Sequence, residues 1–226
     1  MEERMLKLYS KSSNRAPLHA VHGHFATSHS HINYYIDLTS LKTRVKEANE
    51  IARLMADKYV NRNRPIDTII CMDGTETVGT LLAKTFEERE FITVNTHDPI
   101  YVVTPEFNST NQMMFRDNIS PCIRGKNVVL LLATTTTGVT IRRSIECIEY
   151  YGGKISGICS IFSIIKEVEG YPIESIFTED DVPGYKAYRQ KDCPFCKNNI
   201  PIEAMVNGFG YSKMEATRTG FGSRQS

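Results

Sequence analysis

Residues 127–140, NVVLLLATTTTGVT, constrain the fold of this chain more than any other stretch. Residues 128–132 form a continuous apolar run, which is the pattern of a parallel strand covered on both faces. Small residues follow as far as Gly138, and isoleucines then recur at helical spacing through Ile148. The order therefore predicts a buried strand, a compact turn and a helix.

A turn of this kind is suited to binding an anion. Its backbone N–H groups are free, the helix dipole is positive at that end, and threonine hydroxyls add further donors. The alternative is a plain strand-to-helix connection that happens to be rich in threonine.

The rest of the chain repeats the alternation of strands and helices. This alternation predicts a doubly wound, mainly parallel sheet with its ligand at the carboxyl ends of the strands. Residues 1–14 are polar and are expected to be partly helical, and residues 107–115 are expected to form a flexible loop. The predicted strands are 33–37, 67–72, 91–95, 100–103, 155–165 and 175–177, and the predicted helices are 41–59 and 78–86.

Composition excludes several classes of partner. The chain has 226 residues and a net charge of +1, with scattered basic residues, so we expect no nucleic-acid partner. No apolar run approaches the roughly 20 residues that span a bilayer, and the first residues are charged where a signal peptide would be apolar. We therefore expect no membrane partner and a cytoplasmic location. Six cysteines are too few for a disulfide framework and are expected to be reduced.

The turn itself carries a resemblance to a known family. Thr136, Thr137 and Gly138, followed by Thr140, resemble the phosphoribosyl-pyrophosphate (PRPP) signature of the type I phosphoribosyltransferases, whose loop holds the 5′-phosphate of PRPP. That family also has two adjacent acidic residues just before the loop, which hold the ribose hydroxyls, and these positions are Leu132 and Ala133 here. The implied phosphate-binding residues are Thr135, Thr136, Thr137, Gly138, Val139 and Thr140.

Residues 23–37 resemble the N-terminal segment of one branch, the orotate phosphoribosyltransferases. There, a turn containing phenylalanine leads into an aromatic strand that helps to hold the pyrimidine. Phe25, Tyr34, Tyr35 and Asp37 match, so the resemblance implies that Phe25, Tyr34 and Tyr35 lie on the base side. The alternative is that the two tyrosines are ordinary strand aromatics.

Residues 73–76 lie where the family places its pyrophosphate-binding loop. The implied residues are Asp73, Gly74, Thr75 and Glu76. Glu76 would repel a diphosphate unless Mg²⁺ intervenes, so Mg²⁺ is the cofactor expected to accompany PRPP. Alternatively, Glu76 is simply a favourable residue in the first turn of a helix.

Two further motifs raise the question of a metal. Residues 19–31 hold five of the six histidines, which could bind a metal or could belong to a mobile polar loop. Cys193 and Cys196 form half of a zinc motif, which a His or Cys from elsewhere could complete. Orotate phosphoribosyltransferases often end in a similar Cys-Pro-x-Cys followed by Ile/Val-Pro, as at Ile200 here. We assign no metal ligands from the sequence.

The family's mobile catalytic loop is rich in Arg and Lys, but residues 107–115 contain neither. We therefore expect a PRPP or nucleotide 5′-phosphate ligand, whereas the missing acidic pair and basic loop argue against transfer at normal rates. The alternative is a non-catalytic PRPP- or nucleotide-sensing or assembly protein. The expected parts are an N-terminal hood (1–40), an α/β core (41–190) and a C-terminal segment (191–226). The resemblance also implies a homodimer.

Overall fold

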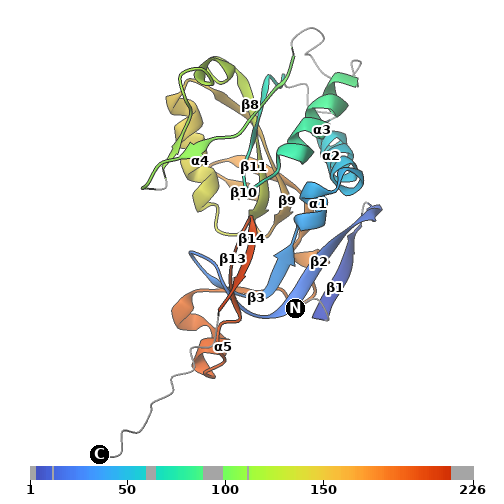
Figure 1. The fold of residues 1–226 in the computed structure, drawn as a ribbon, viewed down its shortest axis with the longest axis vertical. Coiled ribbons are helices and arrows are strands. Elements are labelled where there is room, and N and C mark those ends of the chain that lie inside the picture. The colour runs from blue at the N-terminus through green and yellow to red at the C-terminus, as the bar shows by residue number, and fades with distance from the viewer. Residues whose placement is uncertain (1–3, 12, 60–64, 89–98, 111, 215–226) are drawn as a thin grey trace, which may run out of the picture.

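The computed structural model describes residues 4–11, 13–59, 65–88, 99–110 and 112–214. These residues form a parallel α/β core and a second sheet stacked at one end of it, which we call the hood sheet (Figure 1). The predicted strand at 91–95 lies outside the described residues.

The core sheet has the order β10-β11-β9-β8-β4-β5. All neighbouring strands in it are parallel except the antiparallel pair β10 and β11. The predicted doubly wound parallel sheet is therefore confirmed. The strands are β4 (Thr68–Cys71), β5 (Tyr101–Val103), β8 (Asn127–Thr135), β9 (Lys154–Ser163), β10 (Glu167–Val168) and β11 (Tyr171–Thr178).

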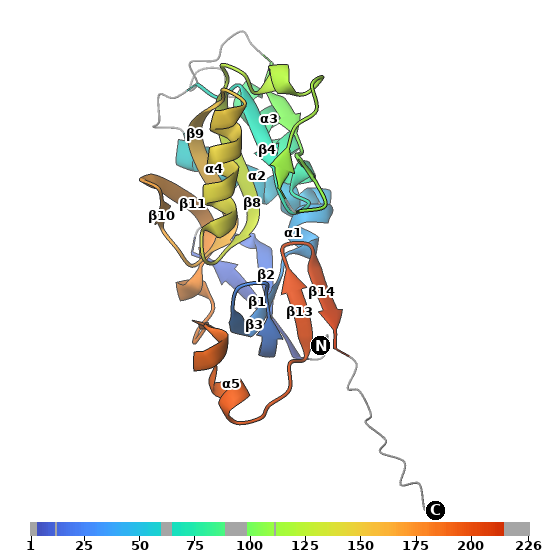
Figure 2. The ribbon, with the colours of Figure 1, turned by 90° about the vertical axis from the view of Figure 1, so that its left-hand side faces the viewer.

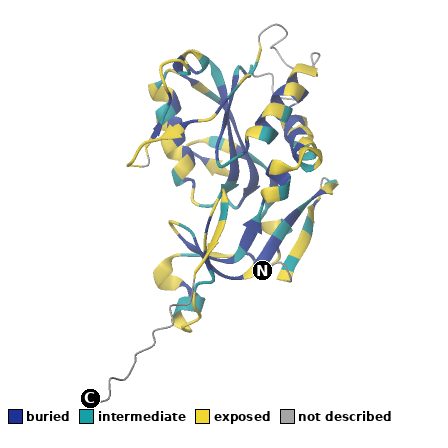
Figure 3. Ribbon diagram, viewed as in Figure 1, coloured by how far each residue is buried: buried dark blue, intermediate teal, exposed yellow. Residues whose placement is uncertain are grey.

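Helices cover both faces of this sheet, with α2 (Val45–Tyr59) and α3 (Glu76–Glu88) on one side and α4 (Val139–Tyr150) on the other (Figure 1). Leu131 of β8 belongs to the same apolar cluster as α2 and α3, whereas Leu130 belongs to the cluster of α4. Because successive side chains of a strand point to opposite faces, the apolar run of β8 is buried from both sides (Figure 3).

The predicted helix at 41–59 is two helices, since a short α1 (Thr39–Thr43) precedes α2. Arg44 separates them with an extended backbone, φ −92° and ψ 117°. The hydrophobic pattern continues across this residue, so the break could not be predicted from that pattern.

The hood sheet has the order β12-β3-β2-β13-β14, with β1 paired to β2. The expected helix in residues 1–14 is wrong for the described part of this stretch, which forms β1 and the start of β2. Pairing with the long strand β2 overrides the local preference of a polar segment. The strands are β1 (Met5–Ser10), β2 (Ser13–Ala26), β3 (His31–Asp37), β12 (Ala187–Tyr188), β13 (Ala204–Asn207) and β14 (Gly210–Lys213).

Both ends of the described chain build the hood sheet. Ala204 of β13 pairs with Phe25 of β2, and Ala187 of β12 pairs with Ile32 of β3. Figure 2 shows the β13–β14 hairpin beside the N-terminal strands, with its turn directed toward α1. The hood is thus larger than residues 1–40. The short helix α5 (Pro194–Lys197) lies below it (Figure 2).

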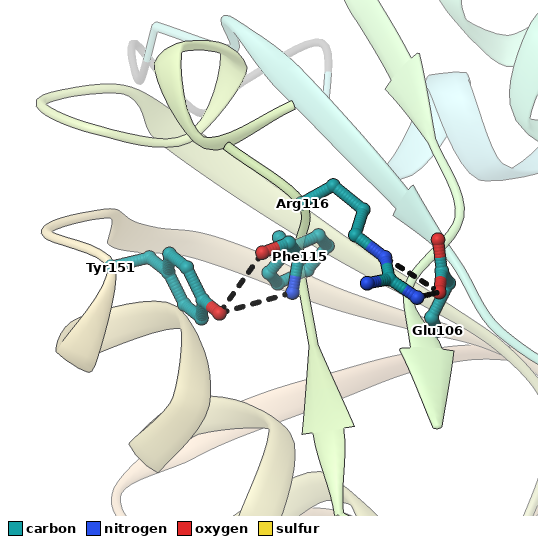
Figure 4. Close-up of polar contacts among 4 residues, drawn as sticks. All are labelled: Glu106, Phe115, Arg116 and Tyr151. Atoms are coloured by element: carbon teal, nitrogen blue, oxygen red, sulfur yellow. Dashed lines mark hydrogen bonds and ion pairs between the residues drawn. The ribbon is translucent and has the colours of Figure 1, made fainter. Parts of the chain in front are cut away.

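The expected flexible loop at 107–115 includes a small antiparallel hairpin, β6 (Glu106–Phe107) and β7 (Met113–Met114). Arg116 Nε and Nη2 donate to Glu106 Oε2 at 2.9 and 2.7 Å (Figure 4). The Tyr151 hydroxyl accepts from Phe115 N–H at 3.2 Å and donates to the Phe115 carbonyl at 3.0 Å (Figure 4). These contacts attach the hairpin to the end of α4. The remaining short elements are the 3-10 turns η2 (Ser120–Cys122), η3 (Glu179–Asp181) and η4 (Gln190–Asp192).

None of the helices in the described ranges is long and apolar enough to cross a bilayer.

Candidate functional site

A cavity of about 360 Å³ lies between the carboxyl ends of the core strands and the hood sheet. Its walls come from the β8–α4 loop, the turn after β4, strand β3, the β13–β14 turn and Phe107 of β6. This is the position at which parallel α/β sheets bind their ligands.

The predicted phosphate loop forms one wall of this cavity. Strand β8 ends at Thr135, and α4 begins at Val139 without a side-chain cap, so the loop itself is residues 136–138. The first N–H groups of a helix have no acceptor within the helix and are therefore available to an anion. Gly138 is in the left-handed region, with φ 74°. Of the six residues predicted for phosphate, all but Val139 line the cavity.

Thr135 differs from its neighbours in what its hydroxyl contacts. It is 4% exposed, and its Oγ1 donates to Ser160 Oγ on β9 at 3.2 Å. Thr137 and Thr140 are exposed. The hydroxyls available to a ligand are therefore those of the loop and of the first turn of α4.

The two positions that lack the acidic pair have different surroundings. Leu132 lines the cavity, whereas Ala133 packs into the apolar cluster of α2 and α3. Both are at most 1% exposed. A carboxylate restored at position 132 would face the cavity, but one at position 133 would be buried among apolar groups.

Asp73 is the one acidic residue among the described residues that line the cavity. It follows β4, the neighbour of β8, and has φ 56°, in the left-handed region. Burial raises the pKa of its carboxyl group, while Lys42 and a hydrogen bond with the Ala133 backbone act in the opposite direction. Three acidic residues in the sequence, Asp73, Glu76 and Asp98, are candidates to replace the missing carboxylates. Asp73 lies in the cavity, Glu76 does not line it, and Asp98 lies outside the described residues.

Lys42 was not singled out by the sequence. It is 5% exposed, and its Nζ donates to the carbonyls of Asp73 at 2.8 Å and Gly208 at 2.6 Å. Burial lowers the pKa of Lys42, and the nearby charges of Asp73, Glu76 and Asp37 oppose that shift. The lysine thus joins the turn after β4 to the β13–β14 turn. A lysine in a short helix gives no sequence signal for such a role.

Of the residues predicted for the base side and the pyrophosphate loop, some line the cavity and others are buried in the core or lie elsewhere. Tyr35 lines the cavity and is 4% exposed, and burial raises the pKa of its hydroxyl. Tyr34 contacts the ring of His22, with centroids 5.0 Å apart, and Phe25 is fully buried. Thr75 is also fully buried, and its hydroxyl donates to the Met72 carbonyl at 2.8 Å. Neither Phe25, Tyr34, Gly74 nor Thr75 lines the cavity.

Cations are scarce at this site. No Lys or Arg is among the described residues that line the cavity, although His29 is. Arg116, the first basic residue after the β6–β7 hairpin, is paired with Glu106, and this pair lowers the pKa of the glutamate. The hairpin therefore contributes Phe107 to the cavity and no positive charge.

Known proteins resemble the chain in sequence. No family model matches it. The orotate phosphoribosyltransferase of Pyrococcus horikoshii is 28% identical over 151 residues, which are 66% of this chain and 73% of that protein. The orotate phosphoribosyltransferase of Thermotoga maritima is 35% identical over 81 residues, which are 35% of this chain and 41% of that protein.

Solved structures share the fold at low identity. Mycobacterium tuberculosis orotate phosphoribosyltransferase has a TM-score of 0.50 at 17% identity, covering 73% of this chain and 91% of that chain. Leishmania donovani UMP synthase has a TM-score of 0.52 at 17% identity, covering 80% of this chain and 36% of that one.

The structural features and the comparisons agree. The chain combines a parallel core, a hood sheet and a Thr-Thr-Gly loop at the cavity with similarity to known phosphoribosyltransferases. The chain therefore has the fold of the type I phosphoribosyltransferases. The curated proteins that it resembles in sequence are orotate phosphoribosyltransferases.

Proposed function

We propose that the chain binds PRPP or a nucleotide through its 5′-phosphate at the Thr-Thr-Gly loop. The observation that carries the proposal is the placement of that loop. Its residues and the uncapped start of α4 open into the same cavity as Asp73 and Tyr35. A phosphate at the helix end would leave the ribose directed toward the hood sheet.

The carboxylate of Asp73 would hold Mg²⁺ together with PRPP, and the ion would supply positive charge to the diphosphate. Oxygen ligands from one carboxylate and the substrate's own phosphates are a common environment for this ion. The proposal therefore assigns Asp73 part of the role that the adjacent acidic pair has in the family.

Transferase activity is the less favoured part of the proposal. The diphosphate leaving group develops negative charge as the glycosidic bond breaks, and preorganised positive groups stabilise it. The described cavity wall provides no Lys or Arg. This observation favours the alternative, a non-catalytic protein that senses PRPP or a nucleotide or supports an assembly.

Calorimetry tests the binding proposal directly. Purified protein is titrated with PRPP, with orotidine 5′-monophosphate and with inorganic phosphate, each with and without Mg²⁺. Micromolar binding of PRPP that strengthens with Mg²⁺ is expected. If neither PRPP nor the nucleotide binds, the loop does not serve a ribose-phosphate ligand.

A gain-of-binding variant separates the two functions. Leu132→Asp places a carboxylate on the cavity wall and should strengthen Mg²⁺-dependent PRPP binding several-fold if the remaining site suits ribose. Orotate turnover is measured in parallel for both proteins. Binding without turnover in either protein supports the sensing alternative, and turnover by the wild type supports the transferase.

The resemblance also leads us to propose a homodimer. Light scattering on the purified chain, with and without PRPP, gives the mass in solution and tests this directly.

A further inference from the structure

Two motifs that are far apart in the sequence meet below the hood sheet. His24 of β2 and His31 of β3 lie beside Cys193 and Cys196 at the start and within α5. One ligand atom from each of the four residues lies within 4.8 Å of the other three. The histidine-rich stretch and the Cys-Pro-x-Cys motif are therefore two halves of one cluster.

The spacing of these atoms matches a tetrahedral metal site. His24 Nε2 lies 3.0 Å from His31 Nδ1, 3.5 Å from Cys193 Sγ and 3.7 Å from Cys196 Sγ. His31 Nδ1 lies 3.3 Å from Cys196 Sγ. Zn–N bonds of about 2.05 Å and Zn–S bonds of about 2.3 Å at tetrahedral angles would separate the two nitrogens by about 3.3 Å and each N–S pair by about 3.5 Å.

The ring of His24 is oriented by a hydrogen bond on its far side. His24 Nδ1 lies 2.8 Å from the carbonyl of Ile200, which can only accept, so Nδ1 carries the proton. In a neutral ring the lone pair is then on Nε2, the atom that faces the cluster. A carbonyl that fixes the tautomer of a ligating histidine is a recurrent feature of protein metal sites.

The cluster is closed to solvent on most sides. His24, Cys193 and His31 are 1%, 0% and 7% exposed, and Cys196 is half-buried. The ring of Phe195 stacks on His24, with centroids 5.1 Å apart and planes at 15°. Four protein ligands in a closed environment leave no position for a substrate, which indicates a structural rather than a catalytic metal.

We propose that His24 Nε2, His31 Nδ1, Cys193 Sγ and Cys196 Sγ together bind one structural Zn²⁺ ion. Two thiolates and two imidazoles in a tetrahedral arrangement are the donor set that zinc takes in closed sites. Binding releases the thiol protons to solvent, and no redox step is involved.

This site would fasten the C-terminal part of the hood sheet to its N-terminal hairpin. Directly after the cysteines, Glu203 N–H donates to the His24 carbonyl at 2.8 Å, and Ala204 pairs with Phe25. Strand β13 then leads to Asn207 and Gly208, which line the cavity. The metal would therefore hold in place a strand whose far end reaches the proposed ligand site.

Metal analysis of the full chain, purified without chelator, is the first test. About one zinc per chain is expected, with no comparable amount of iron, copper or nickel. Titration of the thiols with a mercurial in the presence of a chromogenic zinc chelator should release that zinc. Cobalt loading of the stripped protein should produce the visible bands of a tetrahedral thiolate site.

Single substitutions then locate the ligands. Cys196→Ser and His31→Ala should each reduce bound zinc at least tenfold under competition with a chelator. Cys122→Ser and His22→Ala are the matched controls, because Cys122 is also half-buried and His22 is an exposed histidine on β2, the strand of His24. Both controls should retain full zinc.

Wild-type results alone can overturn the proposal, so it does not depend on the variants folding. Folded protein that contains no zinc and takes up Zn²⁺ more weakly than about 1 µM contradicts it. A Cys193–Cys196 disulfide as the state of freshly purified protein under reducing conditions does so as well. These outcomes are measured on the metal itself and do not require PRPP binding, because none of the four cluster residues lines the cavity.

Discussion

Gly138 combines two restrictions at one position of the phosphate loop. Its φ of 74° is rarely adopted by residues with a Cβ atom, and an added Cβ would lie 2.7 Å from Val168 Cγ2. The loop therefore depends on glycine both for its backbone conformation and for its packing against β10.

Gly138→Val should abolish binding of phosphorylated ligands, because the loop must move to relieve both restrictions. Gly125→Val is the control, since Gly125 has φ 73° but open space around it. Both variants should lose stability, by about 1–2 kcal/mol or more from backbone strain. Only the first should lose affinity in calorimetry. Equal affinity of both variants for the phosphorylated ligand would show that the loop is not part of the binding site.

Asp73 should give the folded protein a distinctive pH dependence. Its folded-state pKa is raised above the ordinary value of 3.8, so between those two values the folded chain binds more protons than the unfolded chain. Stability contributed by this group is therefore present at low pH and is lost as the pH rises through the folded pKa.

Asp73→Asn removes that contribution. The free energy of unfolding of the variant, relative to wild type, should increase as the pH rises through this window, as measured by urea titration at a series of pH values. Asp180→Asn, on an exposed turn, is the control. A flat difference for Asp73→Asn would mean that burial does not perturb this carboxyl group.

The positions of individual side chains at the site were harder to predict from the sequence than the helices and strands. The threonines and glycine of the loop could be named because their order is local. Lys42 could not, because its partners are the carbonyls of Asp73 and Gly208, 31 and 166 residues away. Phe25 and Tyr34 were placed on the base side by their motif, but neither lines the cavity: Phe25 is fully buried, and Tyr34 contacts the ring of His22.

At the scale of elements, hydrophobic periodicity located the core well. The apolar runs became β4, β8 and β9, and the helices around them followed. Elements that depend on pairing with a distant partner were missed. Residues 107–115 look like a polar loop, but β6 and β7 pair across a turn in which Asn108 Oδ1 accepts from the Thr110 and Gln112 N–H groups.

The hydroxyl of Tyr151 should stabilise the packing of the β6–β7 hairpin against the end of α4. Tyr151→Phe removes a hydroxyl that bonds to both backbone groups of Phe115 (Figure 4), which should cost about 1–2 kcal/mol of unfolding free energy. Tyr150→Phe is the control, because Tyr150 is 84% exposed. Denaturant titration of both variants is the measurement, and an equal loss in the two would contradict the role of the hydroxyl.

For the whole molecule, the sequence identified two parts of the hood without indicating that they join. Residues 23–37 and the cysteine motif were separate observations, and neither contains a signal for the pairing of β2 with β13. Only the three-dimensional arrangement brings His24 to Cys193, and only that arrangement identifies which four residues would bind a metal.

If zinc fastens the hood, removing it should also affect the cavity that the hood sheet helps to line. Protein stripped by a chelator should have a lower midpoint of thermal unfolding and should bind PRPP several-fold more weakly, and added Zn²⁺ should restore both. Gly138→Val should retain its zinc while losing PRPP binding. Unaltered PRPP affinity in the stripped protein would show that β13 keeps its position without the metal.

The pairing of β2 with β13 also has a consequence for the order in which the protein can be completed during synthesis. The parallel core is formed by residues 68–178, whereas the hood sheet needs partners separated by about 180 residues. Contacts of such long sequence separation form late, after the local ones. A nascent chain that has emerged only as far as β11 would have a complete core sheet but an incomplete hood sheet. Its ligand pocket would close only when β13 leaves the ribosome.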